Sequence, residues 1–228
     1  MNKKKVFLLL CTLAAIGLFF FFDLQRFFTL PALKANRQAI LAYYAEHRMN
    51  TVLVFMLIYI VQTILSLPGA AIMSLAAGAI FGSLLGTIYA SIAATIGATL
   101  ACLVYRYLLR DFVLSKFGSR LEGMNRELES RGLNYLLFLR LVPIFPFFLI
   151  NMAASLTRLP LRTFILGTMI GIVPAGFIFV NAGASLATID SLADIASPRV
   201  LGSLALLGLL ALLPALYNHF RRNKEKGS

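Results

Sequence analysis

The chain has 228 residues, of which 60% are hydrophobic and only 13% are charged, and its mean hydropathy is +0.85. A soluble domain of this size does not need so much apolar sequence, and several apolar runs approach the roughly 20 residues that cross a bilayer. These values exclude a soluble globular protein and predict an all-α integral membrane protein.

The formal net charge of +12 does not indicate a nucleic-acid partner. The basic residues lie in short loops between apolar segments, where the positive-inside rule puts them. Both cysteines, Cys11 and Cys102, lie within apolar segments, so no disulfide framework and no metal-ligand spacing is present. We therefore expect no nucleic acid, no metal and no cofactor.

The first apolar run, Val6 to Phe22, follows a cluster of three lysines and ends without a small-x-small cleavage pattern. It predicts an uncleaved transmembrane helix at the start of an N-terminal unit, residues 1–50. The polar connection at 23–50 contains Pro31, which favours the first turn of a helix. An interfacial amphipathic helix is one interpretation of this connection, and an ordinary solvated connector is the other.

A long apolar stretch at 51–105 is interrupted at Leu67-Pro68-Gly69. The residue before a proline is pushed out of the helical region, and a glycine permits a tight turn. We expect this stretch to form a broken segment up to residue 85 and then a clean transmembrane span at 87–105.

Three glycines follow the break at four-residue spacing, namely Gly78, Gly82 and Gly86. Residues four apart share one face of a helix, and small residues on a face allow close helix packing in lipid. A helix-packing role is therefore expected for all three, with direct ligand contact as the alternative.

The main hydrophilic loop, 106–131, carries six basic and four acidic residues and is expected to be a solvated face with short helices.

The next segment, Leu133 to Thr157, is almost wholly apolar. An arginine near the bilayer centre costs about 2.5–3.5 kcal/mol on insertion scales, and broken backbone survives there only beside protein or a wet cavity. The segment nevertheless contains Arg140, Pro143, Pro146 and Asn151. It therefore predicts a re-entrant hairpin that lines a polar site.

A span at 161–183 follows this hairpin, so residues 133–183 repeat the layout of 51–105. Paired broken segments in two halves of a chain indicate a transport site near the bilayer midplane. We expect a core at 51–190 with two inverted re-entrant hairpins facing each other, followed by residues 191–228, a C-terminal transmembrane helix with a basic tail.

This arrangement gives about four spans and, by the distribution of Lys and Arg, cytoplasmic N- and C-termini. A rival arrangement makes 51–67 a full span, which gives five spans and a translocated N-terminus. The chain's orientation is expected to follow the first arrangement.

Arg140 has no acidic partner within the apolar segments, because 6–22, 51–105, 132–189 and 200–217 contain no Asp or Glu. No nucleophile–base set lies in them either, so the protein is not expected to be an enzyme. The guanidinium has three options: it snorkels to the interface, bonds unwound carbonyls near Pro143 and Pro146, or binds an external anion. Guanidinium matches phosphate in a bidentate manner, and lipid head groups supply phosphate in a membrane.

Further polar residues would complete such a site. Gln62, Ser66 and Asn151 can add uncharged hydrogen bonds. Arg158 and Arg162 follow the hairpin at its expected inner mouth, where basic side chains recruit anionic head groups.

Three motifs carry a resemblance to a known family: LPG…AAGAIFG at 67–82, LRLVPIFPFFLIN at 139–151 and GTMIGIVP at 167–174. Together they resemble the DedA superfamily, most closely its SNARE-associated Golgi protein branch of VTT-domain membrane proteins. The resemblance covers residues 50–190. It implies two opposed re-entrant hairpins and lipid movement between leaflets, either phospholipid scrambling or polyprenyl-phosphate recycling.

The resemblance also assigns residues. Arg140 matches the first arginine of the family's second hairpin, and Pro68-Gly69 match the turn of the first. Ala70 stands where an acidic residue commonly follows in bacterial members, and Pro146-Phe147 occupy the place of a second arginine. Proton coupling through an acidic pair is therefore not expected.

The sequence thus predicts a membrane lipid transporter, a scramblase or flippase, in a bacterial plasma membrane. Its partners are lipids with phosphate head groups, anionic phospholipid or polyprenyl phosphate, and a homo-oligomer is left open. An ion-coupled transporter of small solutes is one alternative. The other is a membrane scaffold that recruits partners through 106–131.

Overall fold

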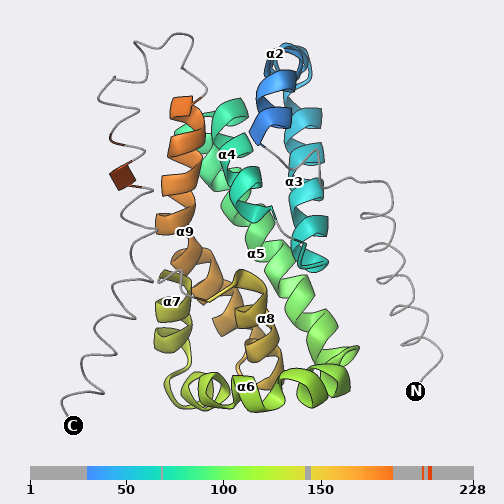
Figure 1. Ribbon diagram of the computed structural model, residues 1–228, viewed down its shortest axis with the longest axis vertical. Coiled ribbons are helices and arrows are strands. Elements are labelled where there is room, and N and C mark those ends of the chain that lie inside the picture. The colour runs from blue at the N-terminus through green and yellow to red at the C-terminus, as the bar shows by residue number, and fades with distance from the viewer. Residues whose placement is uncertain (1–29, 68, 142–144, 187–201, 203–204, 207–228) are drawn as a thin grey trace.

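The computed structural model describes residues 30–67, 69–141, 145–186, 202, 205 and 206 (Figure 1). The described chain is helical and contains no strand, which confirms the all-α class. The spans expected at 6–22 and 200–217 lie outside the described residues, apart from the three isolated positions. Pro68 and Pro143 also lie outside them.

The described helices follow one another with short connections. In chain order they are α2 (Leu30–Glu46), α3 (Arg48–Ile64), α4 (Ala70–Phe81), α5 (Ser83–Tyr107), α6 (Arg110–Arg131), α7 (Leu133–Leu141), α8 (Phe147–Leu156) and α9 (Leu161–Leu186).

Two of the described helices, α5 and α9, are long and apolar enough to cross a membrane. They have 25 and 26 residues, which at 1.5 Å per residue is about 38 Å, more than the roughly 30 Å of the hydrocarbon core. They contain the predicted spans 87–105 and 161–183. Both run from one end of the molecule to the other (Figure 1).

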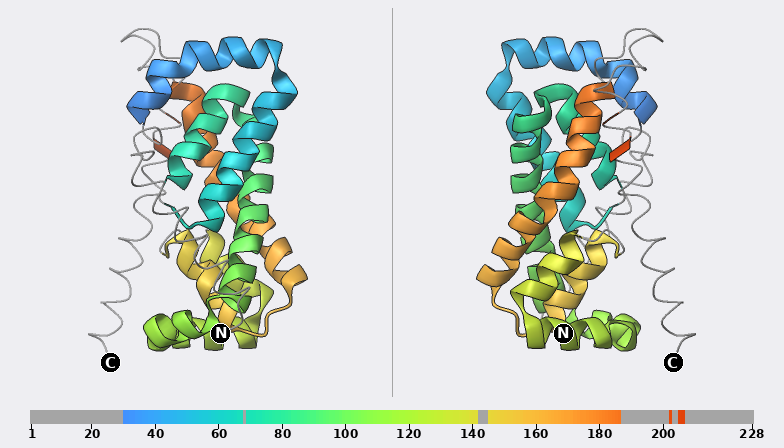
Figure 2. Two further views of the ribbon diagram at one scale, coloured as in Figure 1. Left: turned by 90° about the vertical axis from the view of Figure 1, so that its right-hand side faces the viewer. Right: turned by 90° about the vertical axis from the view of Figure 1, so that its left-hand side faces the viewer.

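The shorter apolar helices form two hairpins that enter from opposite ends of the molecule (Figures 1 and 2). α3 has 17 residues, about 25 Å, after which the chain reverses into α4. Ser66, with φ 54°, and Gly69, with φ 123°, make this reversal. α7 and α8 form the second hairpin from the other end, and the two tips point toward each other between α5 and α9.

Helices α2 and α6 lie across the two ends of the molecule (Figure 2). α2 has Pro31 in its first turn, so of the two interpretations of 23–50 a helix is found over Leu30–Glu46. The short helices expected at 106–131 are wrong, because 22 of its residues form the single helix α6, but most of its charged side chains are exposed, as expected of a solvated face. Its apolar residues recur at helical spacing and are buried against the core, namely Val113, Leu121, Met124 and Leu128.

The three glycines after the first break do not share one helix face, which corrects the sequence interpretation. Gly82 ends α4 with φ 77°, and no neighbour lies within 4 Å of where its Cβ would be. A positive φ is cheap only for glycine. Gly78 and Gly86 have the tight surroundings expected of packing positions. A Cβ on Gly78 would overlap the Val180 carbonyl of α9, and one on Gly86 would lie 2.6 Å from the Ala77 carbonyl oxygen.

The buried apolar side chains form two clusters along the long axis. One joins α3, α4, α5 and α9 around Phe55, Met73, Phe81 and Val180. The other joins α5, α6, α7, α8 and α9 around Leu128, Leu136, Leu139, Ile150 and Phe164. Each hairpin therefore has its own core, and the two cores share only the long helices.

Candidate functional site

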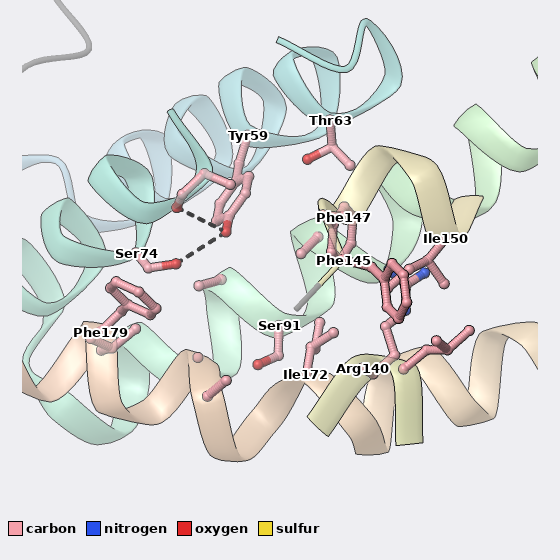
Figure 3. Close-up of a pocket in the computed structure, with 17 residues that line it drawn as sticks. Tyr59, Thr63, Ser74, Ser91, Arg140, Phe145, Phe147, Ile150, Ile172 and Phe179 are labelled. Atoms are coloured by element: carbon pink, nitrogen blue, oxygen red, sulfur yellow. Dashed lines mark hydrogen bonds between the residues drawn. The ribbon is translucent and has the colours of Figure 1, made fainter. Parts of the chain in front are cut away.

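A cavity of about 240 Å³ lies where the two hairpin tips approach each other (Figure 3). Both hairpins and both long helices contribute to its wall. The lining residues are Tyr59, Thr63, Ala70, Ser74, Ala90, Ser91, Ala94, Leu139, Arg140, Phe145, Phe147, Ile150, Ile172, Ala175, Gly176, Phe179 and Val180. Arg140 is the one charged side chain among these residues.

Arg140, in the last turn of α7, is only 5% exposed. Its Nη2 donates to Asn151 Oδ1 at 2.7 Å and to Thr168 Oγ1 at 3.1 Å, so α8 and α9 both hold it. The guanidinium therefore does not snorkel to bulk water. Within the described residues it pairs with no carboxylate and with no backbone carbonyl.

Aromatic rings enclose the same guanidinium. Its Cζ lies 4.2 Å from the ring centroid of Phe147 and 5.5 Å from that of Phe164. A cation over an aromatic face gains about 2 kcal/mol or more where water is excluded. Gly171 of α9 makes room for the aliphatic part of the side chain, because a Cβ there would lie 2.5 Å from Arg140 Cβ.

The hydrogen-bonding capacity around Arg140 is incompletely used. Its Nε and Nη1, and Nδ2 of Asn151, are buried and have no partner among the described residues. Each unsatisfied buried group costs about 1–3 kcal/mol, and more where it is charged. All three atoms are donors, so a ligand rich in acceptor oxygens would satisfy them. A buried cation also gains most from an anionic partner.

The other predicted residues of the second hairpin occupy different places. Asn151 is fully buried and is the nearest polar partner of Arg140. Pro146 precedes the first turn of α8, accepts from the Leu149 N–H and is exposed. Arg158 and Arg162 are exposed and do not line the cavity. They lie on and just after the α8–α9 connection, at the end of the molecule where α6 lies (Figure 1).

The predicted residues of the first hairpin hold its tip together. Gln62 Nε2 donates to the Leu67 carbonyl at 3.2 Å, and the Ser66 hydroxyl lies 2.6 Å from the Tyr105 hydroxyl of α5. Gly69 precedes the first turn of α4, and its carbonyl accepts from the Met73 N–H. None of the three lines the cavity.

Several residues of the site were not singled out by the sequence. Thr168 carries no distinguishing signal in an apolar helix, and neither do the cavity hydroxyls of Tyr59, Ser74 and Ser91. Arg106 had been counted among the solvated charges of 106–131. Its Nη2 instead donates to three carbonyls at the end of α8 and in the following turn, those of Ala154 at 3.1 Å, Leu159 at 3.2 Å and Thr157 at 3.4 Å.

Comparison with known proteins gives one family match, the VTT domain, over residues 67–185. This range contains Arg140, Asn151 and Thr168.

Among similar proteins, the Transmembrane protein 41 homolog of Dictyostelium discoideum is 35% identical over 117 residues, which are 50% of this chain and 35% of that protein. That of Caenorhabditis elegans is 36% identical over 107 residues, 46% of this chain and 42% of its own. Human Transmembrane protein 41B is 29% identical over 122 residues, 54% of this chain and 40% of its own. The match therefore spans less than half of these relatives, and no solved structure matches the chain.

Proposed function

Since the chain belongs to the VTT domain family of membrane proteins, we propose that it carries anionic lipids between the two leaflets of its membrane. In this proposal Arg140 binds the phosphate of the head group. One observation carries it: a guanidinium is buried in a cavity between two opposed hairpins, with unused donors and with no carboxylate near it in the described chain.

The proposal treats the hairpins as re-entrant and α5 and α9 as membrane-spanning. The cavity then lies near mid-depth, where an unaccompanied lipid phosphate meets its highest barrier. A polar head group is costly in hydrocarbon because nothing there replaces its hydration. A preorganised cation with spare donors replaces part of that hydration and so lowers the barrier for crossing.

Transport in this proposal is passive. Coupling to protons needs a titratable group at membrane depth, and the described residues that line the cavity include no Asp, Glu or His. The sequence contains no Asp or Glu between 51 and 105 or between 132 and 189. A lipid would therefore move down its own gradient, which is the behaviour of a scramblase.

The membrane placement is part of the same proposal. Large apolar side chains are exposed along the sides of the long helices, for example Ile92, Ile96 and Ile170. Such faces suit contact with lipid tails. We assign the termini to the cytoplasmic side of a plasma membrane because of the excess of Lys and Arg there. Labelling of single cysteines from each side tests that orientation.

The test is reconstitution of the full chain in vesicles that contain an acyl-labelled anionic phospholipid. An impermeant reductant then reports how fast label leaves the inner leaflet. We expect Arg140→Gln to slow this rate about tenfold or more, since a hydrogen bond to a charged group contributes about 1.5–3 kcal/mol. Arg126→Gln, on the exposed side of α6, is the matched control and should transport at the rate of the unmodified protein.

The thermal unfolding midpoint of each variant shows whether slower transport comes from loss of phosphate binding or from loss of folded protein. A folded Arg140→Gln protein that transports as fast as the unmodified one would refute the assignment of Arg140. Absence of transport by the unmodified protein would refute the function.

A further inference from the structure

We propose that the cavity selects anionic phospholipids whose head group is an uncharged polyol, because hydroxyl side chains form the wall that faces Arg140. This inference rests on the proposed function and deepens it. It concerns the part of the head group beyond the phosphate.

Four hydroxyl side chains line the cavity: Tyr59 and Thr63 of α3, Ser74 of α4 and Ser91 of α5. All are between 5% and 8% exposed, so they are removed from bulk solvent. Figure 3 shows Tyr59 and Ser74 together, away from Arg140, with Ser91 nearer the middle of the cavity. The first hairpin and α5 therefore supply hydroxyls, and the second hairpin supplies the cation.

The hydroxyl groups have hydrogen-bonding capacity left over. The Tyr59 hydroxyl lies 3.1 Å from Ser74 Oγ and 3.3 Å from the Ala70 carbonyl oxygen. In the part of the chain that the structure describes, the hydroxyls of Thr63 and Ser91 have no hydrogen-bond partner. A hydroxyl both donates and accepts a hydrogen bond, so each of these groups can pair with a hydroxyl of a polyol head group.

The remaining wall is apolar and aromatic, with Phe145, Phe147, Ile172 and Phe179 among its members, and its described residues include no carboxylate. A quaternary ammonium can lie against such rings. A primary ammonium group would lose its hydration there, would find no carboxylate and would share the cavity with the charge of Arg140, which is costly.

A bare phosphate ester is also a poorer match than a polyol ester. Its phosphate would satisfy Arg140 and Asn151, but nothing would reach the hydroxyls across the cavity. A buried polar group left unpaired is a strong means of rejecting an analogue that lacks the complementary group. A phosphate followed by a glycerol or a similar polyol satisfies both walls.

The experiment compares three lipids with the same labelled acyl chain in the vesicle assay: phosphatidylglycerol, phosphatidic acid and phosphatidylethanolamine. The unmodified protein should move phosphatidylglycerol fastest, about fivefold or more faster than phosphatidic acid, and phosphatidylethanolamine slowest. Ser91→Ala and Tyr59→Phe should each lower the ratio of the phosphatidylglycerol rate to the phosphatidic acid rate about fivefold. Thr99→Ala removes a hydroxyl of α5 that bonds within its own helix and is the matched control.

Three results would overturn the inference: equal rates for phosphatidylglycerol and phosphatidic acid, variants that slow all lipids by one factor, or a polyprenyl phosphate that moves faster than phosphatidylglycerol. These results are distinct from failure of the proposed function. If Arg140→Gln slows every lipid while the two anionic lipids move equally fast, only the head-group inference fails. If Arg140→Gln changes no rate, or the unmodified protein moves no lipid, both fail.

Discussion

The substitution Asn151→Asp gives the sharpest test of the idea that Arg140 awaits an external anion. Asn151 Oδ1 already lies 2.7 Å from Arg140 Nη2, and Asp has nearly the same size and shape as Asn. The substitution places a carboxylate at this position without moving either side chain. The protein then supplies its own counter-ion, and a lipid phosphate has to compete with it.

The magnitude follows from the geometry. Opposite unit charges at 4 Å attract by about 4 kcal/mol at an effective dielectric constant of 20, and the two groups here are at least that close. Each 1.4 kcal/mol is about a tenfold change, so anion binding should weaken by up to about a thousandfold. The cost of removing water from the new carboxylate offsets part of its attraction to Arg140. We therefore expect a transport rate lower by at least about tenfold, with a thermal unfolding midpoint no lower than that of the unmodified protein.

Two variants isolate the cause. Asn151→Ala removes the amide without adding charge, and its transport should fall less than that of Asn151→Asp. Asn134→Asp makes the same amide-to-carboxylate change at an exposed position in the first turn of α7 and should leave transport unaltered. A folded Asn151→Asp protein that moves anionic lipid at the unmodified rate would show that Arg140 binds no anion during transport.

Two further substitutions test the packing that positions the site. Gly171→Ala puts a Cβ 2.5 Å from Arg140 Cβ, so α7 must shift on α9. We expect unfolding to become about 1–3 kcal/mol easier and lipid transport to slow, whereas Gly123→Ala, where nothing lies within 4 Å, should not slow transport. Arg106→Gln removes donation to three carbonyls around the end of α8. We expect a lower unfolding midpoint and faster amide hydrogen exchange at 154–159, and unchanged exchange there would contradict this role.

The outline of the fold could be predicted because its signals are local. One proline and one glycine mark the break at 67–69, and long apolar runs mark α5 and α9. Arg140 was recognisable because a charge within an apolar membrane segment is energetically costly and therefore indicates a functional role. Asn151 was recognisable for the same reason, as the one amide in its apolar neighbourhood.

The rest depends on packing that no local pattern records. Thr168 reaches Arg140 only because α7 lies closely against α9, across 28 residues of sequence, and threonines of this kind occur in many apolar helices. Gly82 has the same spacing from its neighbours whether it belongs to a helix face or ends a helix, and only its φ of 77° distinguishes the two roles. The hydroxyls of Tyr59 and Ser91 likewise can be recognised as cavity-lining groups only once the two hairpins are placed tip to tip.

The position of the cavity follows from which helices the hairpins pack against. α4 and α7 both pack on α9, while α3 and α8 both pack on α5, and the two hairpins make few contacts with each other. Gly183 of α9 admits the backbone of α4 at Leu75, and Gly171 of the same helix admits Arg140 of α7. The spacing of these two glycines along α9 therefore fixes where α4, which carries Ser74, and α7, which carries Arg140, lie along the same long helix. Because the tips do not pack against each other, the space between them stays open. It lies where the chain reverses direction in each hairpin, between α3 and α4 and between α7 and α8.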